Sequence, residues 1–169
     1  MIATAFNASG MKSVNAIECD QPFRHWIVDG LFEPDVIAAA SRSLDSFEPA
    51  ITAGSQGSAG WVQYDGPFER KRSFNVLAGM PDAVRHCIYE WNTQTFASQL
   101  GELTGIVGLR PDEKMWGGGI HIMGRGDFLL PHLDHSHNPN GLERRLSMIV
   151  FLNENWSDSW GGAFELWSN

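Results

Sequence analysis

Cysteine is scarce in this chain. Only Cys19 and Cys87 occur among 169 residues, the first in a predicted tail and the second in a predicted helix. Small secreted domains that depend on disulfides are dense in cysteine, and this chain is not. The sequence therefore argues against a disulfide framework and indicates a reducing, cytoplasmic location.

Basic charge is also scarce. Twelve Lys and Arg residues stand against twenty Asp and Glu residues, which gives a net charge of -8. Proteins that bind nucleic acid concentrate Lys and Arg on one face, and the only basic cluster here is "ERKR" at 69–72. We predict that this cluster is a solvated loop. Nucleic acid is excluded as a partner.

Long apolar runs are missing too. No run reaches the length of a membrane span, so no membrane partner is expected. The first twenty residues lack a basic stretch followed by an apolar core, so we expect no signal peptide and a disordered tail over 1–20. A hydrophobic content of 43% and a charged content of 19% are typical of a globular chain. The length predicts one domain.

Residues 21–115 have a mainly helical pattern. Residues 32–47 place Val36, Ile37, Ala40, Leu44 and Phe47 along one stripe, with Pro34 in the first turn. Residues 80–92 repeat this arrangement behind Pro81. A third amphipathic stretch contains Phe96, Leu100 and Leu103, and Gly105 suits its end. Between the first two helices, a flexible loop at 51–60 leads into a short strand at 61–64.

Residues 116–169 have a β pattern. Short runs rich in β-branched and aromatic residues are separated by turn-forming residues, and the runs are "GIHIMG", "DFLLPHLD", "RRLSMIVFLN" and "AFELW". This spacing predicts an antiparallel sandwich or barrel. The glycines at 117–119 do not form a nucleotide-binding motif, because no helix follows them. We expect them to let a strand begin close to a neighbouring backbone, and Gly124 and Gly126 to form a tight turn.

The segment "LLPHLDHSHNP", residues 129–139, concentrates side chains that can bind a metal. In a strand, residues i and i+2 point to the same face, so His132 and Asp134 can both reach one ion. An imidazole and a carboxylate that leave the ion's other coordination positions free are two of the three ligands in the facial triad that holds non-haem iron(II). His135 and His137 are predicted to be solvated loop residues. A zinc site that uses all four residues is the alternative, although neighbouring residues 134 and 135 do not converge easily on one ion.

The order of these features resembles the iron(II)/2-oxoglutarate-dependent dioxygenases, in particular their prolyl 4-hydroxylase-like branch. A glycine turn precedes Pro-His-x-Asp, an Arg-Arg-Leu run ends in Phe151-Leu152-Asn153, and Gly161-Gly162 precedes Glu165-Leu166-Trp167. The resemblance covers residues 100–169 well and 21–100 more loosely. It implies an α+β fold, namely a double-stranded β-helix (jelly roll) with helices packed outside one sheet. It also implies iron(II), 2-oxoglutarate and O₂, with ascorbate as a further candidate.

The resemblance assigns His132 and Asp134 as iron ligands. A tyrosine that usually contacts 2-oxoglutarate is replaced here by Met123, and His121 is a possible substitute. Arg145 and Ser147 share one face of the next predicted strand, so either could line the cavity. The substrate expected is a small molecule or a peptidyl group.

The resemblance also implies a third ligand and a basic residue for 2-oxoglutarate on later strands. The sequence given stops at Asn169, so we expect residues 116–169 to be the first half of the jelly roll, cut off at the C-terminus, and the 169-residue chain to be inactive and self-associated. The alternatives are a non-catalytic jelly-roll or cupin-like binding module that descends from such an enzyme, and a cupin-like metal enzyme.

Overall fold

The computed structural model describes residues 15–45, 47 and 61–168. Within these residues, helices alternate with antiparallel strands, so the fold is of the α+β class. The elements are, in order, β1 (Asn15–Cys19), β2 (His25–Asp29), α1 (Pro34–Asp45), β3 (Trp61–Asp65), β4 (Glu69–Phe74), the 3-10 turn η1 (Leu77–Gly79), α2 (Asp82–Trp91), α3 (Gln94–Thr104), β5 (Ile120–Ile122), β6 (Phe128–Leu129) and the 3-10 turn η2 (Asp158–Trp160).

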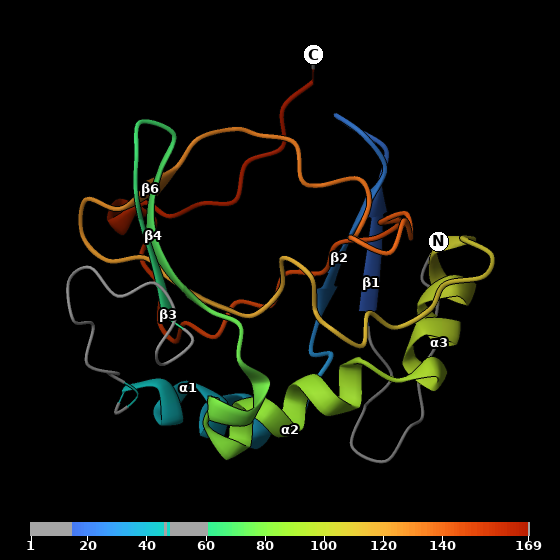
Figure 1. The fold of residues 1–169 in the computed structure, drawn as a ribbon, viewed down its shortest axis with the longest axis horizontal. Helices are drawn as coiled ribbons and strands as arrows, with labels where there is room; N and C mark the ends of the chain where they lie inside the picture. Colours follow the sequence, from blue (N-terminus) through green and yellow to red (C-terminus); the bar gives the residue numbers. More distant parts are fainter. Residues whose placement is uncertain (1–14, 46, 48–60, 169) are drawn as a thin grey trace.

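The three helices form where the periodicity predicted them. In Figure 1, α1 and α2 lie along the lower edge of the molecule and α3 stands at its right-hand end. Helix α1 begins at Pro34, and α2 follows directly after Pro81. Helix α3 is capped at its start by the Thr93 hydroxyl, which accepts from the Phe96 amide. It ends at Gly105, whose left-handed conformation (φ 73°) gives the predicted C-terminal stop.

The larger sheet has β4 at its centre. Strand β3 pairs with one edge of β4, and β5 and β6 pair with β4 as well, all antiparallel. One face of this sheet packs against α1 and α2 around Trp61 and Phe74, whose rings lie 5.2 Å apart. Ala40 and Val84 bring the helices onto that core, and Leu152 from the C-terminal part packs against it. The face of the sheet that carries Trp61 and Phe74 is therefore covered by the helices, and the opposite face is turned away from them.

Gly119 allows β5 to begin close to β4. A Cβ atom at this position would lie 2.3 Å from the Phe74 carbonyl oxygen, and the φ of Gly119 is 137°. Both conditions require glycine, as the sequence predicted for the 117–119 run. The turn at Gly124 is also present, since the Asp127 amide donates to the Gly124 carbonyl oxygen at 3.0 Å.

Two expectations about the N-terminal half were wrong. Residues 15–19 were expected to be part of a disordered tail, but they form β1, which pairs with β2. Strand β2 lies in the region that was read as mainly helical, so it was not foreseen. Residues 69–72, expected to be a solvated loop, lie in β4. The four charged residues at the start of β4 hid a strand whose last two residues, Ser73 and Phe74, are buried. The predicted loop at 51–60 lies outside the described residues, as do 1–14 of the tail.

The C-terminal half contains less regular structure than its β pattern predicted. Strand β6 ends at Leu129, before His132 and Asp134, and the described residues after it run irregularly, apart from a bridge between His137 and Glu143 and the η2 turn. A strand exists only where a second strand takes its backbone hydrogen bonds, and 144–153 and 163–167 have no such neighbour among the described residues. The jelly roll is therefore not confirmed by these strands.

Figure 1 shows how the parts are arranged. The sheet containing β3, β4 and β6 and the β1–β2 hairpin stand at opposite ends of the molecule. The C-terminal half, drawn in orange and red, runs between them as an open coil. None of the helices in the described ranges is long and apolar enough to cross a membrane.

Candidate metal site

His132 directly follows Pro131, just beyond the end of β6 at Leu129. Its Nδ1 atom is 2.8 Å from the Leu130 carbonyl oxygen. Because a carbonyl oxygen only accepts, Nδ1 is the donor in this contact, and Nε2 is the ring nitrogen left to face other groups. Histidines that bind metals are oriented by this kind of backbone contact.

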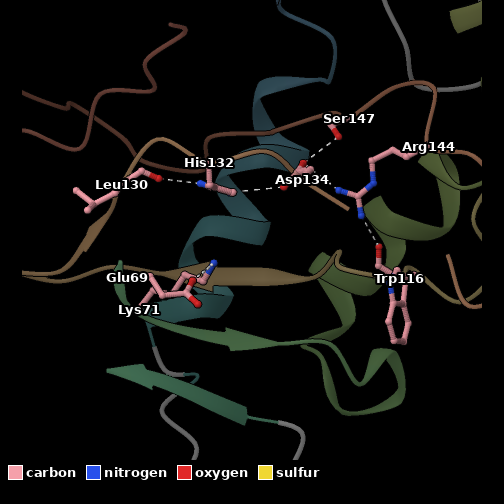
Figure 2. Close-up of polar contacts among 8 residues, drawn as sticks. All are labelled: Glu69, Lys71, Trp116, Leu130, His132, Asp134, Arg144 and Ser147. Atoms are coloured by element: carbon pink, nitrogen blue, oxygen red, sulfur yellow. Dashed lines mark hydrogen bonds and ion pairs between the residues drawn. The ribbon is translucent and has the colours of Figure 1, made fainter. Parts of the chain in front are cut away.

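Asp134 presents one carboxylate oxygen to that imidazole. Its Oδ1 lies 3.5 Å from Nε2 of His132. Its Oδ2 is held from the other side, by Nη1 of Arg144 at 2.9 Å and by the Ser147 hydroxyl at 3.3 Å. Figure 2 shows these contacts as a row that runs from Leu130 through His132 and Asp134 to Arg144. The two oxygens of Asp134 therefore have different partners.

The pair suits a metal ion in its donor atoms and nearly so in its spacing. Two ligand atoms at right angles around an ion, each at about 2.1 Å, lie about 3 Å apart. The observed 3.5 Å is close to that value. Among the residues that the structure describes, no group of three or more His, Cys, Asp or Glu side chains could hold a metal. His132 and Asp134 approach each other as a pair, and the four-residue zinc cluster is not assembled among the described residues.

Arg144 connects this pair to the segment before β5. Its Nη2 atom donates to the Trp116 carbonyl oxygen at 2.9 Å, and its backbone amide donates to the Ser136 carbonyl oxygen at 2.7 Å. The Trp116 amide in turn donates to Oδ2 of Asp112 at 2.7 Å. The arginine is thus held at both its backbone and its guanidinium group.

His121 lies on the face of the large sheet that is turned away from the helices. It is paired with Ser73 across β4 and β5, and Lys71 projects from β4 on the same face, since i and i+2 in a strand share a face. The Lys71 ammonium forms an ion pair with Glu69 at 2.9 Å and is only 12% exposed. Desolvation lowers the pKa of His121 and the Lys71 charge lowers it further, while the carboxylates of Asp134 and Glu69 act to raise it. Asp134 is therefore within electrostatic reach of this imidazole.

The other residues that the sequence singled out are less closely connected to the pair. Met123 follows β5 and is 43% exposed. Arg145 was one of two residues that could line the cavity; its guanidinium contacts Glu143 at 3.4 Å, with more than half of each side chain exposed. His137 contacts the Ser136 hydroxyl at 3.0 Å. The roles of Met123, His121 and Arg145 toward 2-oxoglutarate stay predictions.

Arg144 was missed by the sequence reasoning. Strand alternation put Arg145 and Ser147 on one face and left Arg144 on the other. Because 144–147 is not a regular strand, Arg144 and Ser147 both reach Asp134 instead. The sequence does show two neighbouring arginines, Arg144 and Arg145, about ten residues after Asp134. No local pattern indicates which of the two would turn toward that carboxylate.

Comparison with known proteins gives one match. Residues 104–169 match the family model of the 2OG-Fe(II) oxygenase superfamily, and this stretch contains His132, Asp134 and Arg144. No curated protein and no solved structure matches the chain. The match supports the 2OG-Fe(II) oxygenase superfamily for the C-terminal part of the chain, and the name of that family implies iron(II) and 2-oxoglutarate.

Proposed function

We propose that His132 and Asp134 are two of the three iron ligands of a 2-oxoglutarate-dependent hydroxylase of the prolyl 4-hydroxylase-like branch. The observation that carries the proposal is the convergence of Nε2 of His132 and Oδ1 of Asp134, 3.5 Å apart. Each ligand's remaining polar atoms are occupied by the protein, so that one donor atom of each is left to face an ion. Iron(II), when bound with 2-oxoglutarate and O₂, supplies the oxidising power for hydroxylation of a small molecule or a peptidyl group.

The chain's own residues have a limited task in this proposal. The Leu130 carbonyl oxygen keeps the proton of His132 on Nδ1, so that Nε2 binds as a neutral ligand. Asp134 contributes negative charge through one oxygen and leaves neighbouring positions open for the co-substrate. We propose that the third ligand and the group that binds the far carboxylate of 2-oxoglutarate come from outside the described residues.

The proposal includes a jelly roll as the complete fold. The family match supports it, and so does the surface of two runs predicted as strands, 144–153 and 163–167. Ile149, Phe151 and Phe164 in these runs are between 56% and 60% exposed, although their side chains are those of buried strands. A second sheet placed over them would bury these side chains, as the two sheets of a jelly roll do.

The test compares variants of the four clustered residues. His132→Ala or Asp134→Ala should abolish 2-oxoglutarate-dependent CO₂ release, because iron loses a ligand, whereas His135→Ala and His137→Ala should keep most of it. The assay uses the chain extended by any residues that its gene encodes after Asn169, with the 169-residue chain beside it as the form expected to be inactive.

Each pattern of results has a distinct meaning. Loss of turnover in His135→Ala as severe as in His132→Ala would contradict the ligand assignment. Iron binding that needs His132 but never supports CO₂ release, in either length of chain, would favour a non-catalytic binding module over the hydroxylase.

A further inference from the structure

We infer that Arg144 is a positioning residue that holds Asp134 as a one-oxygen ligand, an inference that rests on the proposed function of His132 and Asp134. Its guanidinium group bridges two fixed points, the Oδ2 atom of Asp134 and the Trp116 carbonyl oxygen, each at 2.9 Å. Figure 2 shows Arg144 between Asp134 and Trp116, on the side of the carboxylate opposite His132.

The arginine is itself well anchored. Its side chain is 23% exposed, against 53% for Asp134, so it is the more enclosed partner of the ion pair. Its backbone amide donates to the Ser136 carbonyl oxygen at 2.7 Å. A planar guanidinium with several donors suits this double contact, which an ammonium group would make less well.

The chain leaves room for the guanidinium beside Trp116. A Cβ atom on Gly117 would lie 2.8 Å from Nη2 of Arg144. A side chain at that position would therefore push the guanidinium away from the Trp116 carbonyl oxygen. The contact between Arg144 and the Trp116 carbonyl oxygen therefore depends on glycine at position 117.

Occupation of Oδ2 has a chemical consequence. A free carboxylate can turn and bind a metal through both oxygens, which would fill a coordination position that the co-substrate needs. With Oδ2 engaged by Arg144 and Ser147, only Oδ1 is directed toward Nε2 of His132. Arg144 therefore sets both the direction of the ligand atom and the number of positions that stay open.

Metal affinity tests this role without relying on turnover. Binding of Mn²⁺ alone, measured from the electron paramagnetic resonance signal of the free ion, is compared among the wild-type chain and the variants His132→Ala, Arg144→Gln, Arg144→Lys and Arg145→Gln. We expect Arg144→Gln to bind about 10- to 100-fold more weakly than wild type, as for other residues that orient metal ligands. Arg144→Lys should be intermediate, because one ammonium group replaces a fork that contacts two acceptors.

Arg145→Gln is the matched control. It removes the same charge one residue away, from a side chain that contacts Glu143 and not Asp134, and should bind Mn²⁺ as wild type does. Melting temperatures of the metal-free proteins identify any variant that fails to fold, and Arg144→Lys then takes the place of Arg144→Gln.

Two failures are distinguishable. If the wild-type chain binds Mn²⁺ no more tightly than His132→Ala, the proposed metal pair is overturned and the inference with it. If binding depends on His132 but Arg144→Gln and Arg144→Lys both bind as tightly as wild type, the pair stands and Arg144 is not a positioning residue.

Discussion

The two oxygens of Asp134 have separate partners, and this division is the main chemical feature at the level of single residues. Oδ2 contacts Arg144 and Ser147, whereas Oδ1 faces Nε2 of His132. An ion pair at a surface contributes only about 0 to 1 kcal/mol to folding. The Arg144–Asp134 pair, with Asp134 half-exposed, is therefore better explained by the direction that it gives to the carboxylate than by stability.

Gly117 and Gly108 offer a matched pair of substitutions. Both have a left-handed backbone, with φ of 72° and 76°, so alanine should cost each about 1 to 2 kcal/mol in the free energy of unfolding. Only at Gly117 would the new Cβ atom meet a neighbour, Nη2 of Arg144. We expect Gly117→Ala to cost about 1 kcal/mol more than Gly108→Ala, the contribution of one hydrogen bond, in urea denaturation.

Metal affinity gives a second way to compare the two glycine substitutions. Gly117→Ala should weaken Mn²⁺ binding, and Gly108→Ala should not. Equal effects of the two substitutions on both measurements would mean that the guanidinium moves aside without consequence for Asp134.

Secondary-structure elements differed in how far the sequence could predict them. The helices were predicted closely, because proline at the starts of α1 and α2, an apolar stripe in each helix and Gly105 at the end of α3 all act within a few residues. Strand β4 was missed, because its pattern is charged at one end and apolar at the other. The strand expected at His132 and Asp134 was wrong, since strands depend on a partner that local sequence does not specify.

Contacts between side chains far apart in the sequence were harder still to predict. His132 and Asp134 are two residues apart, so their closeness could be expected from spacing alone. Arg144 and Trp116 are 28 residues apart. Only the fold brings them together, and no local pattern distinguishes Arg144 from Arg145.

Phe74 is the residue on which the packing of β4 against the helices depends. It is 2% exposed and contacts Trp61 and Phe47. We expect Phe74→Ala to lower the free energy of unfolding by about 3 to 5 kcal/mol, because it leaves a cavity between sheet and helices. Phe68, in the turn before β4, is 72% exposed, and Phe68→Ala should change stability by less than about 0.5 kcal/mol. Chemical denaturation followed by circular dichroism measures both, and equal losses would contradict this description of the core.

The surface of the whole molecule is unusually apolar around its C-terminal half. Large hydrophobic side chains with at least 41% of their surface exposed occur repeatedly there, and they include Leu133, Met148, Ile149, Phe151, Phe164 and Trp167. Single exposed apolar residues are ordinary, but contiguous groups of them indicate a surface that is covered by something else.

We therefore expect the 169-residue chain to self-associate. Light scattering after gel filtration should show a mass above that of one chain, rising with protein concentration. Replacing Ile149 and Phe151 together by lysine should lower the apparent mass. Val107→Lys is the control, because Val107 is 95% exposed but lies before residues 116–169, the part of the chain that carries these side chains. A monomer at every concentration would contradict the prediction.

Asp112 contacts both the end of a helix and Trp116, the residue that Arg144 contacts on its side away from Asp134. The side-chain amide of Asn92, which caps the C-terminus of α2, donates to the Asp112 carbonyl oxygen at 2.6 Å. The Asp112 carboxylate holds Trp116, and Trp116 holds Arg144. By thermodynamic linkage, an ion that binds only when Arg144 is in place raises the free energy needed to open each of these contacts. Conversely, if His132 and Asp134 bind an ion as proposed, a substitution that breaks the contact of Asn92 with Asp112 is expected to weaken the affinity for that ion.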